Sequence, residues 1–262
     1  MIAALLSKSG IYGILIFVIG STWSACHQLN SSDLPYAYDQ YRLKSTLTFA
    51  DSLQMEDTTY YQLDYPKFED PQVQDFITLV QLGTDTTDIY AAAQEFIAEY
   101  EAYQVNVPYP RVWTYETSTK VEHLNPVYLG LKSEHYSYTG GAHGLYAFWF
   151  SHYWLPTREV LNFGDLIDTS RMDALLPVAE KYFWTQERMN HPDMEPELYF
   201  FTDQKFQLPD NMQFDGDSVL FLYNIYEIKP YVYGHTEFRV PIRDMEPFLT
   251  DRAKHIVREL NN

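Results

Sequence analysis

The residues of this chain that are best placed to do chemistry cluster in a glycine-rich turn at 137–144. Gly140, Gly141 and Gly144, three of the chain's 11 glycines, surround His143 there. Glycines spaced so closely indicate backbone at positive φ, or close approach by a group that tolerates no side chain. The turn is therefore either a rigid loop that presents an imidazole to a ligand or a tight strand connection whose histidine bonds nearby backbone.

A second informative stretch, 219–242, has the pattern of a strand, an aromatic loop and another strand. Its tyrosines Tyr226, Tyr231 and Tyr233 are either core and loop anchors or, if they face solvent, a platform for a sugar ring or a protein partner. Tyrosine suits such a platform because it supplies a large amphipathic area at low entropic cost. Together with Tyr138 and the glycine-rich turn, these residues form the predicted ligand-binding set.

The remaining histidines and the single cysteine, Cys26, complete no further motif. The chain lacks His-Glu-x-x-His and Gly-x-Ser-x-Gly, and a lone cysteine cannot complete a zinc site. His135, His143 and His152 could meet across neighbouring strands, and a pair of carboxylates cannot be located from the sequence. We therefore predict no metal and no cofactor. A hydrolase built on His143 and unidentified carboxylates is an alternative.

The elements that must position these residues come in blocks of strand and helix patterns, without a βαβα rhythm, a phosphate loop or a repeat. The blocks predict an α+β fold of antiparallel sheets with helices packed on them, in two closely associated subdomains. Period-two patterns predict strands within 36–65 and at 112–121, 127–138, 145–154, 159–161, 219–223 and 236–240. Capped apolar stripes predict helices from Asp70 to Gly83, from Thr86 or Thr87 to about 103, from 168–170 to about 189, and from 243 to 260.

Composition narrows the classes of function. Of the 262 residues 46% are hydrophobic and 17% aromatic, enough to bury a core, which excludes a disordered chain. The 36 acidic residues outnumber the 18 basic ones and give a net charge of −18. Nucleic acid and anionic membrane surfaces would repel such a chain, whereas a basic partner would be attracted.

The N-terminus predicts export. After Lys8, the uninterrupted apolar run at 11–19 is shorter than the roughly 20 residues of a membrane-spanning helix. Residues 1–25 therefore have the proportions of a signal peptide. The small residues before Cys26 resemble a lipobox, so we expect acylation of Cys26, a tether over 26–39, and attachment to the cell envelope by the lipid anchor only. A plain signal peptide and an uncleaved N-terminal anchor are the alternatives.

Taken together, the two stretches resemble the extracytoplasmic family found in RsiV-type anti-sigma factors and as the non-catalytic region of PdaC-type peptidoglycan deacetylases. The likeness covers roughly 40–250 and implies an N-terminal subdomain over 40–138 and a C-terminal one over 139–262. It rests on 136–144 as the signature between the two parts, 161–167 as a strand-to-helix junction, 226–234 with 240–242 as the C-terminal strand pair and, more loosely, 65–66 with 75–77.

Members of this family recur as envelope-exposed sensory or accessory modules, and the anti-sigma examples recognise lysozyme. The resemblance implies a protein ligand, with a cationic lysozyme-like hydrolase as the named candidate, or a cell-wall glycan. Only residues 1–10 precede the apolar run, and the Asp-Asp pair and His-x-x-x-His of a deacetylase are absent. We therefore expect an envelope-anchored binding or sensory module without catalysis of its own, with a peptidoglycan-binding accessory module and a hydrolase as alternatives.

Overall fold

The computed structural model describes residues 34–47, 59–83, 88–105, 107 and 111–261. The expected signal peptide, Cys26 and the first part of the expected tether lie outside these residues. Within them, no helix has both the length and the apolar character needed to cross a bilayer.

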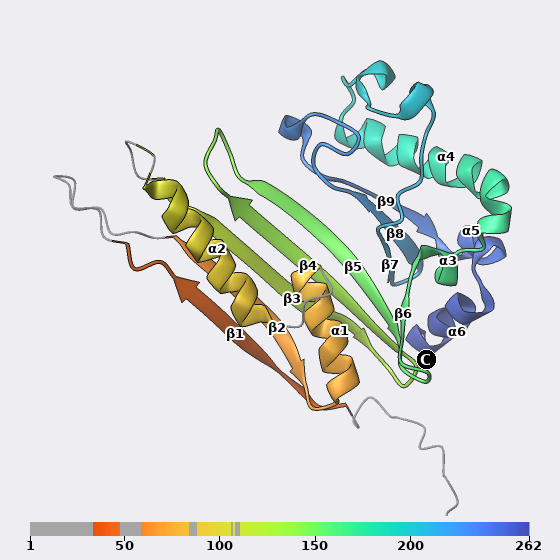
Figure 1. Cartoon of the computed structure of the whole chain (residues 1–262). Helices are drawn as coiled ribbons and strands as arrows, with labels where there is room; N and C mark the ends of the chain where they lie inside the picture. Colours follow the sequence, from red (N-terminus) through yellow and green to blue (C-terminus); the bar gives the residue numbers. More distant parts are fainter. Residues whose placement is uncertain (1–33, 48–58, 84–87, 106, 108–110, 262) are drawn as a thin grey trace, which may run out of the picture.

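A six-stranded sheet forms the larger part of the molecule (Figure 1). Its strands follow chain order, and each neighbouring pair is antiparallel except β2 and β3. That pair is parallel because the chain crosses between the two strands through two helices, as a parallel connection requires. The strands are β1 (Tyr36–Lys44), β2 (Tyr60–Phe68), β3 (Thr114–Leu124), β4 (Tyr128–Tyr138), β5 (Leu145–Trp154) and β6 (Glu159–Leu161).

The two crossover helices, α1 (Pro71–Leu82) and α2 (Ile89–Gln104), cover one face of this sheet (Figure 1). Asp70 caps α1 by accepting from two backbone N–H groups of its first turn, and Gly83 ends it at φ 61°, as the sequence predicts. α2 starts slightly later than predicted. Asp88, not Thr86 or Thr87, is its cap, because the Asp88 carboxylate accepts from the first-turn N–H groups.

A smaller antiparallel sheet of three strands lies beside the large one and carries α4 (Figure 1). The largest apolar core lies between this sheet and its helices. The predicted α+β class, with helices packed on sheets, is confirmed. The elements are β7 (Met212–Asp215), β8 (Ser218–Tyr223), β9 (Thr236–Pro241), α3 (Phe163–Leu166), α4 (Met172–Asn190), α5 (Ile242–Met245) and α6 (Asp251–Leu260).

The expected terminal helix over 243–260 is wrong, because two helices occupy that segment. α5 is short, and α6 starts a new axis at Asp251. Between them lies Pro247, which has no N–H to donate to a continuous helix. Thr250 then caps α6 by accepting from the Ala253 N–H at 3.1 Å.

Two histidines of the large sheet form hydrogen bonds with β7, an edge strand of the small sheet. The Nε2 of His152 lies 2.8 Å from the Met212 carbonyl, and the Nε2 of His123 lies 2.7 Å from the Phe214 carbonyl. Both carbonyls belong to β7, the edge strand of the small sheet. The ring nitrogens therefore donate to backbone groups that an edge strand would otherwise leave open.

Two asparagines hold the two sheets together from the other direction. Because β6 pairs only with the end of β5, Phe148 and Phe150 have no strand beside them on the side away from β4. Asn211 accepts from the Phe150 N–H and donates to the Phe148 carbonyl, at 3.0 and 2.8 Å. Asn224 accepts from the Phe148 N–H at 2.7 Å. Side-chain amides thus replace a neighbouring strand along this stretch.

The predicted end of the tether and the predicted boundary between the subdomains both fall within the large sheet. β1 begins at Tyr36, before the expected end of the tether at 39, because the Tyr36 ring stacks on Phe68 of β2 at 4.9 Å. The expected boundary between 138 and 139 falls at the turn between β4 and β5, which pair with each other. The large sheet therefore spans that boundary.

Candidate functional site

The glycine-rich turn joins β4 to β5 and has the backbone that its sequence predicts. Gly140 and Gly141 have φ values of 99° and 116°, a region that side chains disfavour. The Tyr138 hydroxyl folds back on the turn and donates to the Gly141 carbonyl at 3.0 Å. The turn is therefore held in one shape by its own contacts.

Gly144 meets the second expectation for this turn, close approach by another group. A Cβ at this position would lie 2.2 Å from Cε2 of the Tyr136 ring, well inside van der Waals contact. Tyr136 in turn packs against Tyr146, with ring centroids 4.5 Å apart. The glycine thus lets two aromatic rings pack over the backbone at the start of β5.

The turn presents His143 to the aromatic loop at 224–235. The imidazole stacks on the Tyr231 ring with centroids 3.7 Å apart and an interplanar angle of 19°. Its Nδ1 lies 3.2 Å from the Gly144 carbonyl and its Nε2 lies 3.2 Å from the Tyr226 hydroxyl. The Nδ1 therefore donates to the carbonyl, and the Nε2 accepts from the tyrosine. We call His143, Tyr226 and Tyr231 the aromatic cluster.

Tyr226 holds an unusual backbone conformation within this cluster. Its φ is 68°, in the left-handed region that a bulky residue rarely adopts, and its side chain is 50% exposed. The turn around it is held by the Glu227 carboxylate, which accepts from the Asn224 N–H at 2.9 Å. Strained backbone of this kind is often found at ligand-binding sites.

A shallow groove of about 500 Å³ lies beside the aromatic cluster. Tyr146 and Phe148 of β5 line one side, and Tyr231, Val232 and His235 of the loop line the other. Tyr146 is 50% exposed and Val232 is 82% exposed. We call the cluster, the groove and these exposed side chains the aromatic surface.

Not every predicted site residue reaches this surface. Tyr233 turns toward the end of α4 and packs edge-on against His191 at 5.3 Å. The structure therefore brings His143, Tyr226 and Tyr231 together, with the glycines as their support, and places Tyr233 on the opposite flank of the loop.

Beneath the loop, Lys229 and Glu187 form a buried ion pair that sequence reasoning missed. Both side chains are 2% exposed, and the Lys229 ammonium donates to the Glu187 carboxylate. The Tyr199 hydroxyl donates to the same carboxylate at 3.1 Å. Burial lowers the pKa of Lys229. A usable signal was the spacing of Glu187 four residues after Phe183, which places an acid on the apolar face of α4.

The histidines do not gather as a metal site. His135 contacts Thr117 and Trp149 on the helix-covered face of the large sheet, whereas His152 faces the small sheet. Among the described residues, no three His, Cys, Asp or Glu side chains are placed to hold a metal ion. Both hydrogen-bond partners of His143 given above are uncharged groups.

Comparison with known proteins places the chain among related folds. Residues 53–146 match the family model described as deacetylase PdaC, and residues 164–243 match a family described as a protein of unknown function, DUF3298. The resemblance to the PdaC-like family is confirmed. No curated protein matches the chain.

Two crystal structures share the fold. A DUF3298 family protein from Pseudomonas aeruginosa PAO1 is 19% identical, with 84% of this chain and 96% of that chain covered and a TM-score of 0.63. A member of the DUF3298 family from Bacteroides fragilis NCTC 9343 is 18% identical, with coverages of 88% and 99% and a TM-score of 0.66. At these identities the likeness concerns the fold alone.

The aromatic cluster lies where the PdaC-like and DUF3298 parts meet. His143 belongs to the segment that matches PdaC, whereas Tyr226 and Tyr231 belong to the segment that matches DUF3298. PdaC-like domains are extracytoplasmic, and the chain has the character of an extracytoplasmic accessory module. Two half-exposed aromatic side chains, Tyr146 and Tyr226, therefore lie at or beside the contact between the two matched segments.

Proposed function

We propose that this protein is an extracytoplasmic recognition module that binds a protein ligand through the aromatic surface. The observation that carries the proposal is the packing of His143 of the glycine-rich turn against Tyr231, beside a half-exposed Tyr226 with a left-handed backbone. Rigid, exposed aromatic side chains are the residues that dominate binding energy at protein interfaces.

The charge of the chain supports a basic partner. A net charge of −18 attracts a cationic protein and raises its association rate, and added salt screens that attraction. A lysozyme-like cationic hydrolase is the candidate that the family resemblance suggests. The lipid anchor at Cys26 would hold such a module at the cell envelope.

A cell-wall glycan is the second candidate. The groove beside Tyr146 is bordered by aromatic and aliphatic side chains, and an exposed ring next to a groove is suited to stacking on a sugar. Binding of a neutral glycan would show little salt dependence, which separates it from binding of a cationic protein. The third possibility, a hydrolase using His143, has less support because both hydrogen bonds of the imidazole join it to uncharged groups of the surface.

The test is binding of residues 27–262 to a cationic lysozyme at low and at physiological salt, beside a basic protein of similar charge and different fold. We expect tight binding that survives physiological salt and spares the control protein. Binding that disappears with salt, or that the control shares equally, would contradict the proposal and favour the glycan.

A matched pair of substitutions localises the binding. Val232 and Val105 are 82% and 84% exposed, and Val105 lies at the end of α2, remote in sequence from the aromatic surface. Val232→Asp should weaken lysozyme binding at least about tenfold, because it places a charge among the rings of an interface. Val105→Asp should leave the affinity unchanged. Equal effects of the two substitutions would show that lysozyme does not bind at the aromatic surface.

A further inference from the structure

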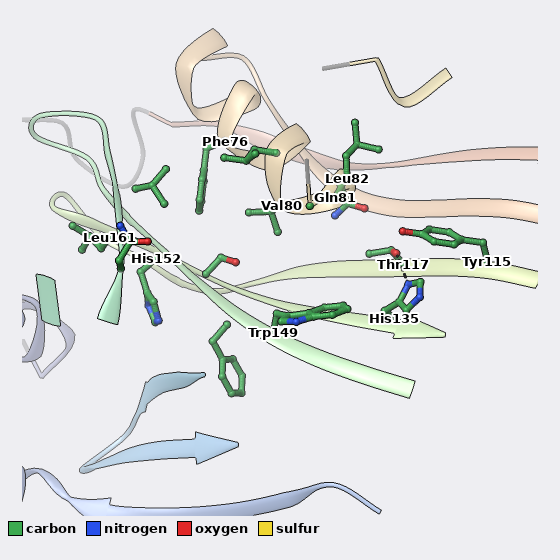
Figure 2. Close-up of a pocket in the computed structure, with 16 residues that line it drawn as sticks. Phe76, Val80, Gln81, Leu82, Tyr115, Thr117, His135, Trp149, His152 and Leu161 are labelled. Atoms are coloured by element: carbon green, nitrogen blue, oxygen red, sulfur yellow. Dashed lines mark hydrogen bonds between the residues drawn. The ribbon is translucent and has the colours of Figure 1, made fainter. Parts of the chain in front are cut away.

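A second groove, of about 490 Å³, lies on the helix-covered face of the large sheet. Figure 2 shows it between the end of α1, which contributes Val80, Gln81 and Leu82, and the strands, which contribute Trp149 and His135. This volume is within the range of about 300–1,000 Å³ that is typical of small-molecule sites. The aromatic surface does not include this groove.

The groove carries no charge. None of the 16 residues that line it is Asp, Glu, Lys or Arg, although the chain has 36 acidic and 18 basic residues. His135, at one end, has a pKa lowered by burial, and its Nδ1 lies 3.1 Å from the Thr117 hydroxyl. A charged ligand would lose its hydration here without gaining a partner, so the lining selects an uncharged one.

Gln81 belongs to the groove wall, but its amide oxygen is buried behind that wall. Gln81 is 3% exposed, and its Nε2 donates to the Thr119 hydroxyl. Its Oε1 has no hydrogen-bond partner among the described residues. That oxygen has almost no solvent-accessible surface, so the groove offers a ligand no hydrogen bond from it and its open lining is apolar there.

The mouth of the groove is apolar and open. Trp149, Val160 and Leu79 are 45%, 44% and 39% exposed around it. The Trp149 ring lies beside the His135 ring, with centroids 5.8 Å apart. An exposed tryptophan at the entrance of an apolar groove offers a face on which a planar ring can stack.

We propose that this groove binds an uncharged, mostly apolar small molecule that carries a ring. The ring would stack on Trp149 and contact Val160 and Leu79. The proposal does not depend on the function assigned to the aromatic surface, because the two grooves lie on different faces of the large sheet.

The test uses N-phenylnaphthylamine, an uncharged probe with a phenyl and a naphthyl ring system, whose fluorescence rises in apolar sites. Titration of residues 27–262 with this probe should give saturable binding with one site per chain. Trp149→Ala should weaken binding about tenfold through the lost stacking partner. Val160→Trp, which fills the mouth from an exposed strand position, should abolish it.

Two controls make the result decisive. Leu198→Trp adds the same side chain at another half-exposed position, remote from the groove lining, and should leave probe binding unchanged. Anilinonaphthalene sulfonate, the charged relative of the probe, should bind at least about tenfold more weakly, since no cation lines the groove. Absent or unsaturable probe binding, binding insensitive to Trp149→Ala and Val160→Trp, or equal binding of the charged relative would each overturn the proposal.

Discussion

Tyr226 joins a strained backbone to a half-exposed ring, so its substitution can separate binding from folding. Its φ of 68° is a conformation that glycine adopts freely and other residues adopt at a cost. Tyr226→Gly should therefore leave the free energy of unfolding unchanged or raise it by up to about 1 kcal/mol. The same change should weaken ligand binding about tenfold, because the ring is lost from the aromatic surface. Urea unfolding and a binding titration on the same preparation check both.

Tyr226→Phe is the matched control. It keeps the ring and the backbone strain and removes only the hydroxyl that donates to the His143 Nε2 at 3.2 Å. The Tyr226→Phe protein should keep most of its affinity for the ligand. Wild-type affinity in Tyr226→Gly would place the ring outside the interface, and a large loss of stability would show that Tyr226 serves packing.

At the scale of residues, local composition indicated the members of the aromatic cluster, but it did not indicate which of them contact one another. Clustered glycines around His143 and clustered tyrosines near Tyr226 can be found in a single sequence because each cluster is local. The contact between His143 and Tyr226 spans 83 residues, and nothing local specifies it. The buried ion pair of Lys229 and Glu187 was not predicted for the same reason. A single charged residue in a sequence is read as a surface residue unless its partner is known.

The predicted bounds agree with the structure at α1 but not at the start of α2, which Asp88 caps instead of Thr86 or Thr87. Asp70 and Gly83 bound α1 as predicted, because one supplies an acceptor and the other a left-handed backbone. The break before α6 was missed because the apolar spacing continues across Pro247, and the missing N–H outweighs that periodicity. The parallel pairing of β2 and β3 depends on how α1 and α2 pack, which strand patterns do not encode.

The contact of His152 with the small sheet should make the free energy of unfolding depend on pH. His152 is buried, with its Nε2 donating to the Met212 carbonyl and its Nδ1 2.6 Å from the Tyr128 hydroxyl. Burial lowers the pKa of His152 from 6.5 to about 4, so the folded chain holds the ring neutral. Below pH 6.5 the His152 imidazole takes up a proton in the unfolded state, whereas in the folded state it stays neutral until the pH approaches 4. This contribution to stability is therefore complete above about pH 6.5 and is lost as the pH falls toward 4.

Between pH 7 and pH 5 the loss from His152 should be about 2 kcal/mol in the free energy of unfolding. Urea unfolding of wild type and of His152→Gln at both pH values measures it, and the other titrating groups cancel in the difference between the two proteins. The substituted protein should lose about 2 kcal/mol less than wild type over this interval. Parallel pH profiles would mean that His152 is not held neutral at its contact with the small sheet.

At the scale of the whole molecule, the apolar core of the small sheet contains residues of both matched segments. Tyr128, the first residue of β4, and Val127 before it belong to the apolar core of the small sheet, and Tyr128 is fully buried there. Phe150 of β5 packs on Leu220 and Leu222 of β8. A separate C-terminal subdomain would have to form without Tyr128, and the large sheet alone would expose Phe150 to water.

We therefore expect residues 27–262 to unfold as one cooperative unit. Amide hydrogen exchange is the measurement, because it gives a local opening free energy at each buried strand position. Leu131 of β4 and Phe221 of β8 lie in different cores but should exchange with the same, global free energy of unfolding. Residues 139–262 expressed alone should fail to show cooperative unfolding, since this fragment lacks Tyr128 and the β4 partner of β5. Opening free energies that differ by more than about 2 kcal/mol between Leu131 and Phe221, or a stable fragment, would instead mean two independent domains that touch at the aromatic cluster.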